Sequence, residues 1–343
     1  MKIALVNTAS LFFRGGAEIL VDDLMMQLQA RGHMVDLYRL PFAMDFGMPL
    51  IRLMEASQML RFDDYDRVIA FKFPAYCVLH RDKSIWMFHQ FRQVYELWGT
   101  ELGIPNEAQY IPLRDMVCHL DEELRHTRHT FTNALEVGKR LKKYNDISSE
   151  VLPPPLENVE KYEPGQTGDY VFYPSRVNSF KRQLLAVEAM QYVKSKVKLI
   201  VAGVCEDPAY DHRITEAIRK KKLGNRVQYE NRWISNEEKY RWMSNCLGSM
   251  YLAYKEDSCG FVSMEAFYCA KPVITCSDSG GTLELIDDQK TGFVCEPDPK
   301  SIAKAMDQLY ADKKKAAGMG NAARKEIIRR DITWDNTIRR LLA

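Results

Sequence analysis

The first forty residues contain two apolar runs with an amphipathic segment between them. Lys2–Val6 and Met34–Tyr38 are the apolar runs, and each has the length of a short buried strand. Between them, apolar residues recur at helical spacing from Ile19 to Leu28, and Gly32 follows. A strand, a helix and a second strand in this order predict a parallel sheet that is covered by helices.

The same alternation continues on both sides of a proline-rich segment. Val151–Leu156 contains three consecutive prolines, which cannot continue a helix or a central strand, so we expect a domain boundary there. Residues 89–125 are rich in aromatic and polar types and form a long excursion off the sheet. Helices are expected at Arg182–Val193 and Phe261–Cys269. The other apolar runs predict buried strands at Arg67–Lys72, Ser84–Phe88, His129–Thr132, Tyr170–Tyr173, Lys198–Ala202, Val227–Tyr229, Ser249–Leu252, Pro272–Thr275 and Gly292–Val294.

Two doubly wound α/β domains are therefore the expected architecture. We place the first at residues 1–157 and the second at residues 158–330. In such sheets ligands bind beyond the carboxyl ends of the strands, so the cleft between the two domains is the expected site.

Composition narrows the class of protein. The 343 residues are enough for two domains with cores of their own. The net charge is only +2, so the composition does not indicate a protein that binds nucleic acid through its overall positive charge or a membrane through a polybasic anchor. None of the eight cysteines form a C-x-x-C pair, so buried reduced thiols are expected. There is no signal-like start and no apolar run near the roughly 18 residues of a spanning helix. We expect a cytoplasmic protein, with peripheral contact at the inner membrane surface left open.

The stretch Tyr254–Gly281 carries the strongest chemical signal. Asp257 and Glu265 stand with seven residues between them, and Glu256 precedes the first of the two. Gly260 permits close approach of a ligand to the backbone. An acid pair alone is better explained by a solvated loop and a helix cap, so the residues around the pair decide whether it has a function.

A helix beginning near Gly260 would present the amides of Gly260, Phe261 and Val262 at its N-terminus, where an anion can bind. Glu265 then lies about one turn inside the helix. Its carboxylate can accept two hydrogen bonds from a vicinal diol such as a ribose. The acid in the preceding loop can meet sugar hydroxyls.

A second signal is the basic segment Tyr173–Arg182, which follows a predicted strand and precedes a predicted helix. It contains Arg176, Lys181 and Arg182. Cations at a helix start are unfavourable beside the positive end of the helix dipole unless an anion binds there. The alternative is an exposed, solvated helix start.

These motifs together resemble the retaining glycosyltransferases of the GT-B fold, family 4, also described as glycosyl transferases group 1. The matching pattern is Asp257, Gly260 and Glu265-Ala266, followed by Ala270-Lys271-Pro272-Val273-Ile274. Gly280-Gly281-Thr282 and Thr291-Gly292-Phe293 continue it. The family usually has glutamate at the first acid. Either the shorter Asp257 substitutes, or a one-residue bulge brings Glu256 into that place. The resemblance is strong over residues 170–295, moderate over 1–40 and thin over 40–165.

The resemblance implies roles for individual residues. Arg176 and Lys181 correspond to the basic pair that holds the donor diphosphate. Gly15 and Gly16, within Arg14–Glu18, correspond to a loop under the donor phosphates and the acceptor site. Taken alone, two glycines are only a turn signal.

Two more positions are placed by the resemblance. His89, just after an apolar strand, corresponds to a histidine near the donor sugar, with a structural hydrogen bonder as the equal alternative. Its neighbours Gln90, Arg92, Tyr95 and Trp98 offer polar and aromatic surfaces suited to an acceptor sugar.

Trp233 lies in the loop that corresponds to the nucleotide-base contacts, although the usual glycine is replaced there by Asn231-Arg232. The tail around Trp334 resembles the family's closing helix, so residues 331–343 are expected to cross back to the first domain. Asp64-Tyr65-Asp66 matches a metal-binding pattern formally, but it belongs to a helix-to-strand turn.

The expected activity is that of a retaining, metal-independent hexosyltransferase. It would use a UDP or GDP sugar as donor and a glycan or lipid-linked acceptor in surface-polysaccharide or glycolipid assembly, with no cofactor. Asp257 or Glu256 and His89 would act at the sugar, and Glu265 would bind the ribose. Two alternatives stay open: a GT-B-like nucleotide-sugar epimerase or hydrolase, and a non-catalytic nucleotide-sugar-binding module.

Overall fold

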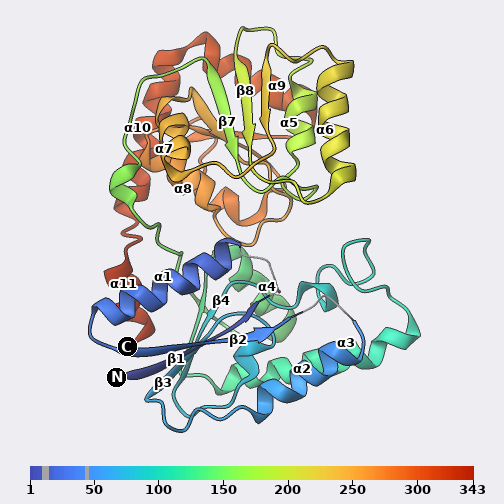
Figure 1. The fold of residues 1–343 in the computed structure, drawn as a ribbon, viewed down its shortest axis with the longest axis vertical. Helices are drawn as coiled ribbons and strands as arrows, with labels where there is room; N and C mark the ends of the chain where they lie inside the picture. Colours follow the sequence, from blue (N-terminus) through green and yellow to red (C-terminus); the bar gives the residue numbers. More distant parts are fainter. Residues whose placement is uncertain (10–14, 43–45) are drawn as a thin grey trace. The chain divides into compact units, whose positions relative to one another are not determined.

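The computed structural model describes residues 1–9, 15–42 and 46–343, and these form two compact units (Figure 1). Unit 1 consists of Met1–Pro155 together with Thr333–Ala343, and unit 2 consists of Leu156–Ile332. The first crossing between the units falls at the proline-rich segment. Both crossings lie within two residues of the boundaries expected from the sequence.

Unit 1 is built on a parallel sheet whose six strands, within the described ranges, lie in the order β2-β1-β3-β4-β5-β6. β1 pairs with both β2 and β3, so the strand order reverses between β1 and β3. Ile3 to Val6 in β1 are fully buried, as their continuous apolar run predicts. The strands are β1 (Lys2–Ala9), β2 (Met34–Pro41), β3 (Arg67–Ala70), β4 (Lys83–Met87), β5 (His129–Thr132) and β6 (Glu150–Val151).

Helices cover this sheet, and the last one comes from the end of the chain. α11 contacts α1 and is tied to the sheet by Arg67, which donates to the Leu341 carbonyl at 3.2 Å, and by Arg340, which donates to the Val151 carbonyl at 3.0 Å (Figure 1). The helices are α1 (Gly16–Ala30), α2 (Met48–Met59), α3 (Ile111–Leu120), α4 (Leu135–Asn145) and α11 (Trp334–Leu341), with the short 3-10 helices η1 (Ala75–Cys77) and η4 (Asp121–His126).

Unit 2 repeats the design with a second parallel sheet, in the order β12-β11-β10-β7-β8-β9 among the described residues. β7 pairs with β8 on one side and β10 on the other, so the order reverses between β7 and β10. The strands are β7 (Tyr170–Pro174), β8 (Lys198–Ala202), β9 (Val227–Glu230), β10 (Gly248–Met250), β11 (Val273–Cys276) and β12 (Gly292–Cys295).

Two groups of helices pack on this second sheet. α5 packs beside α6 and α9, and α8 packs beside α7 and α10 (Figure 1). The helices are α5 (Gln183–Ala189), α6 (Pro208–Lys220), α7 (Asn236–Asn245), α8 (Phe261–Tyr268), α9 (Pro299–Ala311) and α10 (Lys313–Arg329).

The α/β fold class and the predicted strands are confirmed, with differences at element ends. β6, only two residues long, gave no sequence signal. The helix expected to reach Val193 ends at Ala189. From Met190 to Tyr192 each amide donates to the carbonyl three residues earlier, so the chain tightens into a turn instead of continuing the α-helix. All eight cysteines are free thiols, and Cys118 and Cys205 are only partly buried.

Candidate active site

The strongest candidate site lies at the carboxyl edge of the unit 2 sheet, where the strand order reverses. The loops after β7 and β10 meet there, because these two strands are neighbours in the sheet. A reversal of strand order leaves a crevice between the diverging connections, which is where α/β sheets bind ligands. The predicted basic pair and both candidate first acids belong to these two loops.

The loop after β7 fixes Lys181 through its backbone. The Lys181 amide donates to the Asn178 side chain at 3.0 Å, and the Lys181 carbonyl accepts from the Tyr173 hydroxyl. Arg182, at a φ of 57°, precedes α5 and binds the Asp278 carboxylate with two hydrogen bonds of 2.9 and 2.7 Å. The alternative of a solvated helix start is therefore wrong, because carboxylates of the protein hold both cations.

The side chain of Lys181 connects the two loops. Its Nζ donates to the Tyr251 hydroxyl at 2.6 Å and forms an ion pair with Glu256. The Tyr251 hydroxyl in turn donates to Glu256 Oε2 at 2.9 Å. Burial and the Glu256 charge raise the pKa of Tyr251 well above its ordinary value, while the Arg176 charge opposes this rise. The Tyr251 hydroxyl group is thus hydrogen-bonded to Lys181 and Glu256, and the charge of Arg176 also acts on its pKa.

The loop between β10 and α8 carries Glu256 and Asp257 and is called the acid loop here. Two glycines let this loop pack closely. Gly260 has a φ of +78°, and a Cβ there would lie 2.6 Å from the Tyr251 ring. Gly280 has a φ of +60°, and a Cβ there would lie 2.4 Å from the Glu256 carbonyl oxygen. The Gly281 amide donates to that same carbonyl at 2.9 Å. The glycines of the sequence motif are thus needed to clamp the backbone of the acid loop.

α8 begins beside this loop, with Gly260 as its cap. Within the described ranges, the amides of Phe261 and Val262 have no hydrogen-bond acceptor, as expected for the first turn of a helix. The Gly260 amide, in contrast, donates to the Ser258 hydroxyl at 3.2 Å. The expectation that three free amides face an anion is therefore wrong for Gly260, and two remain.

Glu265 lies one turn into α8 and is 5% exposed. Its Oε1 accepts from the Tyr162 hydroxyl at 2.9 Å and from Lys239 Nζ at 2.8 Å. Burial and the Glu265 charge raise the pKa of Tyr162 above its ordinary value, so this tyrosine stays protonated as a donor. Because both bonds fall on Oε1, Oε2 is the oxygen left to accept from a diol. Lys239 and Tyr162 gave no sequence signal, since they are distant from Glu265 along the chain.

Three more predicted residues line the same edge of unit 2. Asp257 is half-buried, next to Glu256 in the acid loop. Arg176 is exposed and borders a pocket of about 250 Å³ at the ends of β7 and β8. Trp233 follows β9 and is 73% exposed, while Arg232 beside it is bound by Glu230 and Glu238. Trp233 is therefore presented as a flat apolar surface.

In unit 1, the predicted glycine loop follows β1, and Arg14 lies outside the described residues. Gly15 caps α1, which begins at Gly16, and the Gly15 amide donates to Glu18 Oε2 at 2.9 Å. Glu18 also forms a buried ion pair with Lys72 at 2.5 Å. Burial would raise the pKa of Glu18, but the Lys72 charge and these hydrogen bonds hold it below its ordinary value. The first turn of α1 therefore already carries an anion of the protein.

His89 follows β4, is half-buried, and its Nδ1 lies 2.8 Å from the Gln90 carbonyl oxygen. Gln90 and Tyr95 are buried, with Tyr95 bonded to the Asp121 carboxylate at 2.6 Å. The expectation that Gln90 and Tyr95 offer surface to an acceptor sugar is therefore wrong. They belong to a polar network inside unit 1.

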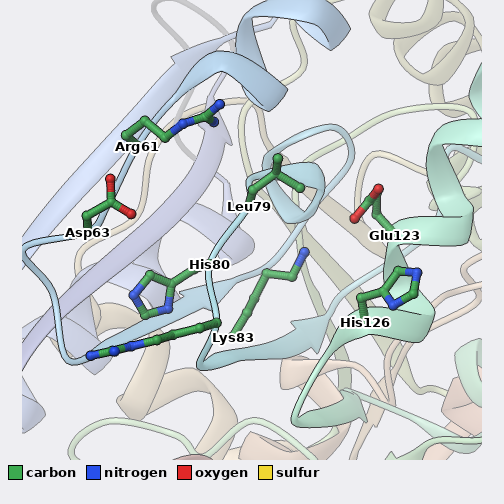
Figure 2. Close-up of a pocket in the computed structure, with 8 residues that line it drawn as sticks. Arg61, Asp63, Leu79, His80, Lys83, Glu123 and His126 are labelled. Carbon is green, nitrogen blue, oxygen red and sulfur yellow. The ribbon is translucent and has the colours of Figure 1, made fainter.

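A separate pocket of about 480 Å³ lies where β4 begins, at the amino end of the sheet (Figure 2). Figure 2 shows Lys83 extending between Leu79 and Glu123. Lys83 is buried, and its Nζ donates at 2.9 Å to the carbonyl oxygens of both Tyr76 and Val78. The lysine therefore ties the loop around η1 to the sheet, at the end opposite the carboxyl edge.

The Asp64-Tyr65-Asp66 pattern lies in the turn before β3, as expected. Asp66 accepts from the Lys2 amide at 2.7 Å, and the Tyr65 hydroxyl donates to Asp36 at 2.7 Å. Among the residues that the structure describes, no cluster of three His, Cys, Asp or Glu side chains could hold a metal ion.

Two parallel sheets of this strand order, each with helices on its faces, define a GT-B fold, the two-domain architecture of many glycosyltransferases. Known structures share it. Sucrose-phosphate synthase from Thermosynechococcus elongatus has a TM-score of 0.77 at 18% identity, over 99% of this chain and 97% of that one. HepE of Anabaena, solved in complex with UDP and glucose, has a TM-score of 0.71 at 15% identity, over 100% and 99%.

The family follows from the sequence of unit 2. The family model described as "Glycosyl transferases group 1" matches residues 156–326, and through this half of the molecule the chain belongs to that family. Alpha-1,3/1,6-mannosyltransferase ALG2 of Homo sapiens is 30% identical over 210 residues, which cover 54% of this chain and 50% of that protein. The chain thus spans about half the length of this relative.

Proposed function

We propose that this protein transfers a sugar from a nucleotide-diphosphate sugar to a glycan or lipid-linked acceptor, with retention of configuration and without a metal ion. The observation that carries the proposal is the cluster at the strand reversal of unit 2. There Lys181 and two open amides of α8 lie beside the acid loop, and Glu265 stands one turn into the helix.

The binding of the donor follows from the negative charge of its diphosphate. A nucleoside diphosphate gains negative charge as the glycosidic bond breaks, and cations already fixed in a partly dry site stabilise that charge without reorganisation. Lys181 and Arg176 supply these cations, and the amides of Phe261 and Val262 add the positive end of α8. Oε2 of Glu265 accepts from the ribose diol.

The sugar is bound from the acid loop, where Asp257 accepts from its hydroxyls. Glu256 is bound by Lys181 and Tyr251, so its carboxylate is not presented to the sugar as a nucleophile. The proposed reaction therefore proceeds on one face of the sugar, with the leaving phosphate taking the acceptor proton. The roles expected for Gly15, Gly16 and His89 remain proposals for unit 1.

The setting is proposed from the relatives. ALG2 is named as a mannosyltransferase and HepE was solved with UDP and glucose, so mannose and glucose are the first donor sugars to test. Glycolipid or surface-polysaccharide assembly in the cytoplasm, at the inner membrane surface, is the proposed context. None of the helices in the described ranges is both long and apolar enough to cross a membrane.

The test is a transfer assay with UDP and GDP sugars and polyprenyl-linked acceptors. Glycosylated product is read by mass spectrometry, and its anomeric configuration by NMR. Transfer faster than donor hydrolysis, with the anomer retained, supports the proposal. Hydrolysis or epimerisation without transfer would favour the nucleotide-sugar epimerase or hydrolase. Tight nucleotide binding without turnover would favour a binding module.

A further inference from the structure

Lys181, the residue proposed to hold the donor diphosphate, is bound in the structure by a carboxylate of the protein itself. Glu256 forms an ion pair with its ammonium group, and the Tyr251 hydroxyl bonds to both partners. The side chains of Lys181 and Glu256 are 18% and 17% exposed, so solvent screens this pair only in part. An ammonium group has three N–H donors, and two of them are used here.

The backbone that carries Glu256 is fixed, whereas its side chain can rotate. The Glu256 carbonyl accepts from the Gly281 amide at 2.9 Å, and the Lys255 amide donates to the Asp278 carbonyl at 2.9 Å. The loop therefore keeps its path if the carboxylate leaves Lys181. Rotation about the side-chain bonds of Glu256 is enough to exchange one anion for another.

We propose that Glu256 is an internal counter-ion that competes with the donor diphosphate for Lys181. This inference rests on the proposed function of the site. A phosphate at hydrogen-bond distance from Lys181 would lie within a few ångströms of the Glu256 carboxylate, and two anions so close repel each other in a partly buried site. The diphosphate therefore displaces Glu256 when it binds, and Tyr251 keeps a hydrogen bond to the lysine.

This competition sets the strength and duration of nucleotide binding. If Lys181 is released by Glu256 in only a fraction of molecules, the apparent dissociation constant of the nucleotide rises by the inverse of that fraction. After transfer, the return of Glu256 to Lys181 promotes release of the nucleoside diphosphate. Glu256 and Asp257 then have separate tasks, because Asp257 serves the sugar.

The test measures binding of UDP, GDP and inorganic pyrophosphate to the full chain by calorimetry. Glu256→Gln removes the competing charge and is expected to tighten binding about tenfold, as it would if Lys181 were free in about a tenth of the molecules. Glu256→Ala serves as a second variant if the amide perturbs the fold. Glu296→Gln, which removes the same charge from an exposed position after β12, is the control and leaves binding unchanged.

A double substitution isolates the pair. In a Lys181→Ala background, Glu256→Gln is expected to tighten binding much less, because the group for which it competes is gone and only the direct repulsion between the two anions is relieved. Stopped-flow release of the nucleotide is expected to be slower in Glu256→Gln than in the unmodified protein. If Lys181→Ala weakens binding but both Glu256 variants bind equally or more weakly, the counter-ion is refuted and the proposed function stands. If none of the three ligands binds the unmodified protein, both proposals fall.

Discussion

The stability of unit 1 is predicted to decrease as pH rises towards neutrality, because of one buried carboxyl group. Asp121 is 0% exposed, and its oxygens accept from the hydroxyls of Tyr76 at 2.8 Å and Tyr95 at 2.6 Å. Besides burial, the groups that act on its pKa among the described residues are these two tyrosines, Glu122 and Asn145, and none of them is a cation. Burial raises the pKa of Asp121 to about 7, although these hydrogen bonds oppose the rise.

The sign follows from linkage. In the folded protein Asp121 keeps its proton up to about pH 7, whereas in the unfolded chain it loses the proton near its ordinary pKa of 3.8. The contribution to stability is therefore fully present below about pH 4 and is lost as pH rises through about 7. A tenfold change in proton affinity is worth about 1.4 kcal/mol, so the whole change amounts to roughly 4 kcal/mol. About 3 kcal/mol of it falls between about pH 5 and about pH 8.

The assay compares the melting temperature of Asp121→Asn with that of the unmodified protein across this pH range. The amide does not titrate, so the melting temperature of the variant should rise relative to that of the unmodified protein by roughly 6–12 °C across this pH range. Asp115→Asn, a change at an exposed carboxyl group on α3, is the control and should show a constant difference. If the difference for Asp121→Asn is also independent of pH, the carboxyl group does not titrate as argued.

Three predictions concern the candidate active site. Arg176→Ala and Lys181→Ala should each lower kcat/KM, by a loss of about 2–4 kcal/mol of transition-state stabilisation, with little change in melting temperature. Unchanged kinetics in both variants would refute the assignment of these residues to the diphosphate. Turnover should survive exhaustive chelation, because cations and helix amides supply the charge; loss with EDTA that manganese or magnesium restores would contradict this. Asp257→Asn should lower kcat with little effect on nucleotide affinity, whereas Glu265→Gln should weaken nucleotide binding in calorimetry. The assignment of sugar and ribose contacts fails if these two effects are exchanged or absent.

The sheets could be predicted because buried parallel strands are continuous apolar runs that need no knowledge of their neighbours. β8 and β5 have the predicted bounds for this reason. The position of the acid loop followed from the spacing of Asp257, Gly260 and Glu265 along one helix start. Such local geometry is encoded within a few residues of sequence.

Hydrogen-bond partners could not be predicted, since they are chosen by the tertiary fold. Tyr251 reads as part of a strand end, yet its hydroxyl joins Lys181 to Glu256. Lys239 reads as one more charge in a polar helix, yet it holds the buried Glu265. Asp121 opens a run of charged residues typical of a solvated turn, and only the packing of η4 buries it.

The return of α11 to unit 1 has a consequence for synthesis of the chain. Most of unit 1 precedes unit 2 along the chain and is translated before it, but Trp334, Ile338 and Leu341, which are buried in α11, are made only after the whole of unit 2. The apolar surface that α11 covers must therefore stay unpaired while unit 2 is translated, and unit 2 can complete its core before unit 1 does. For the same reason, no single cut of the chain separates the two units intact.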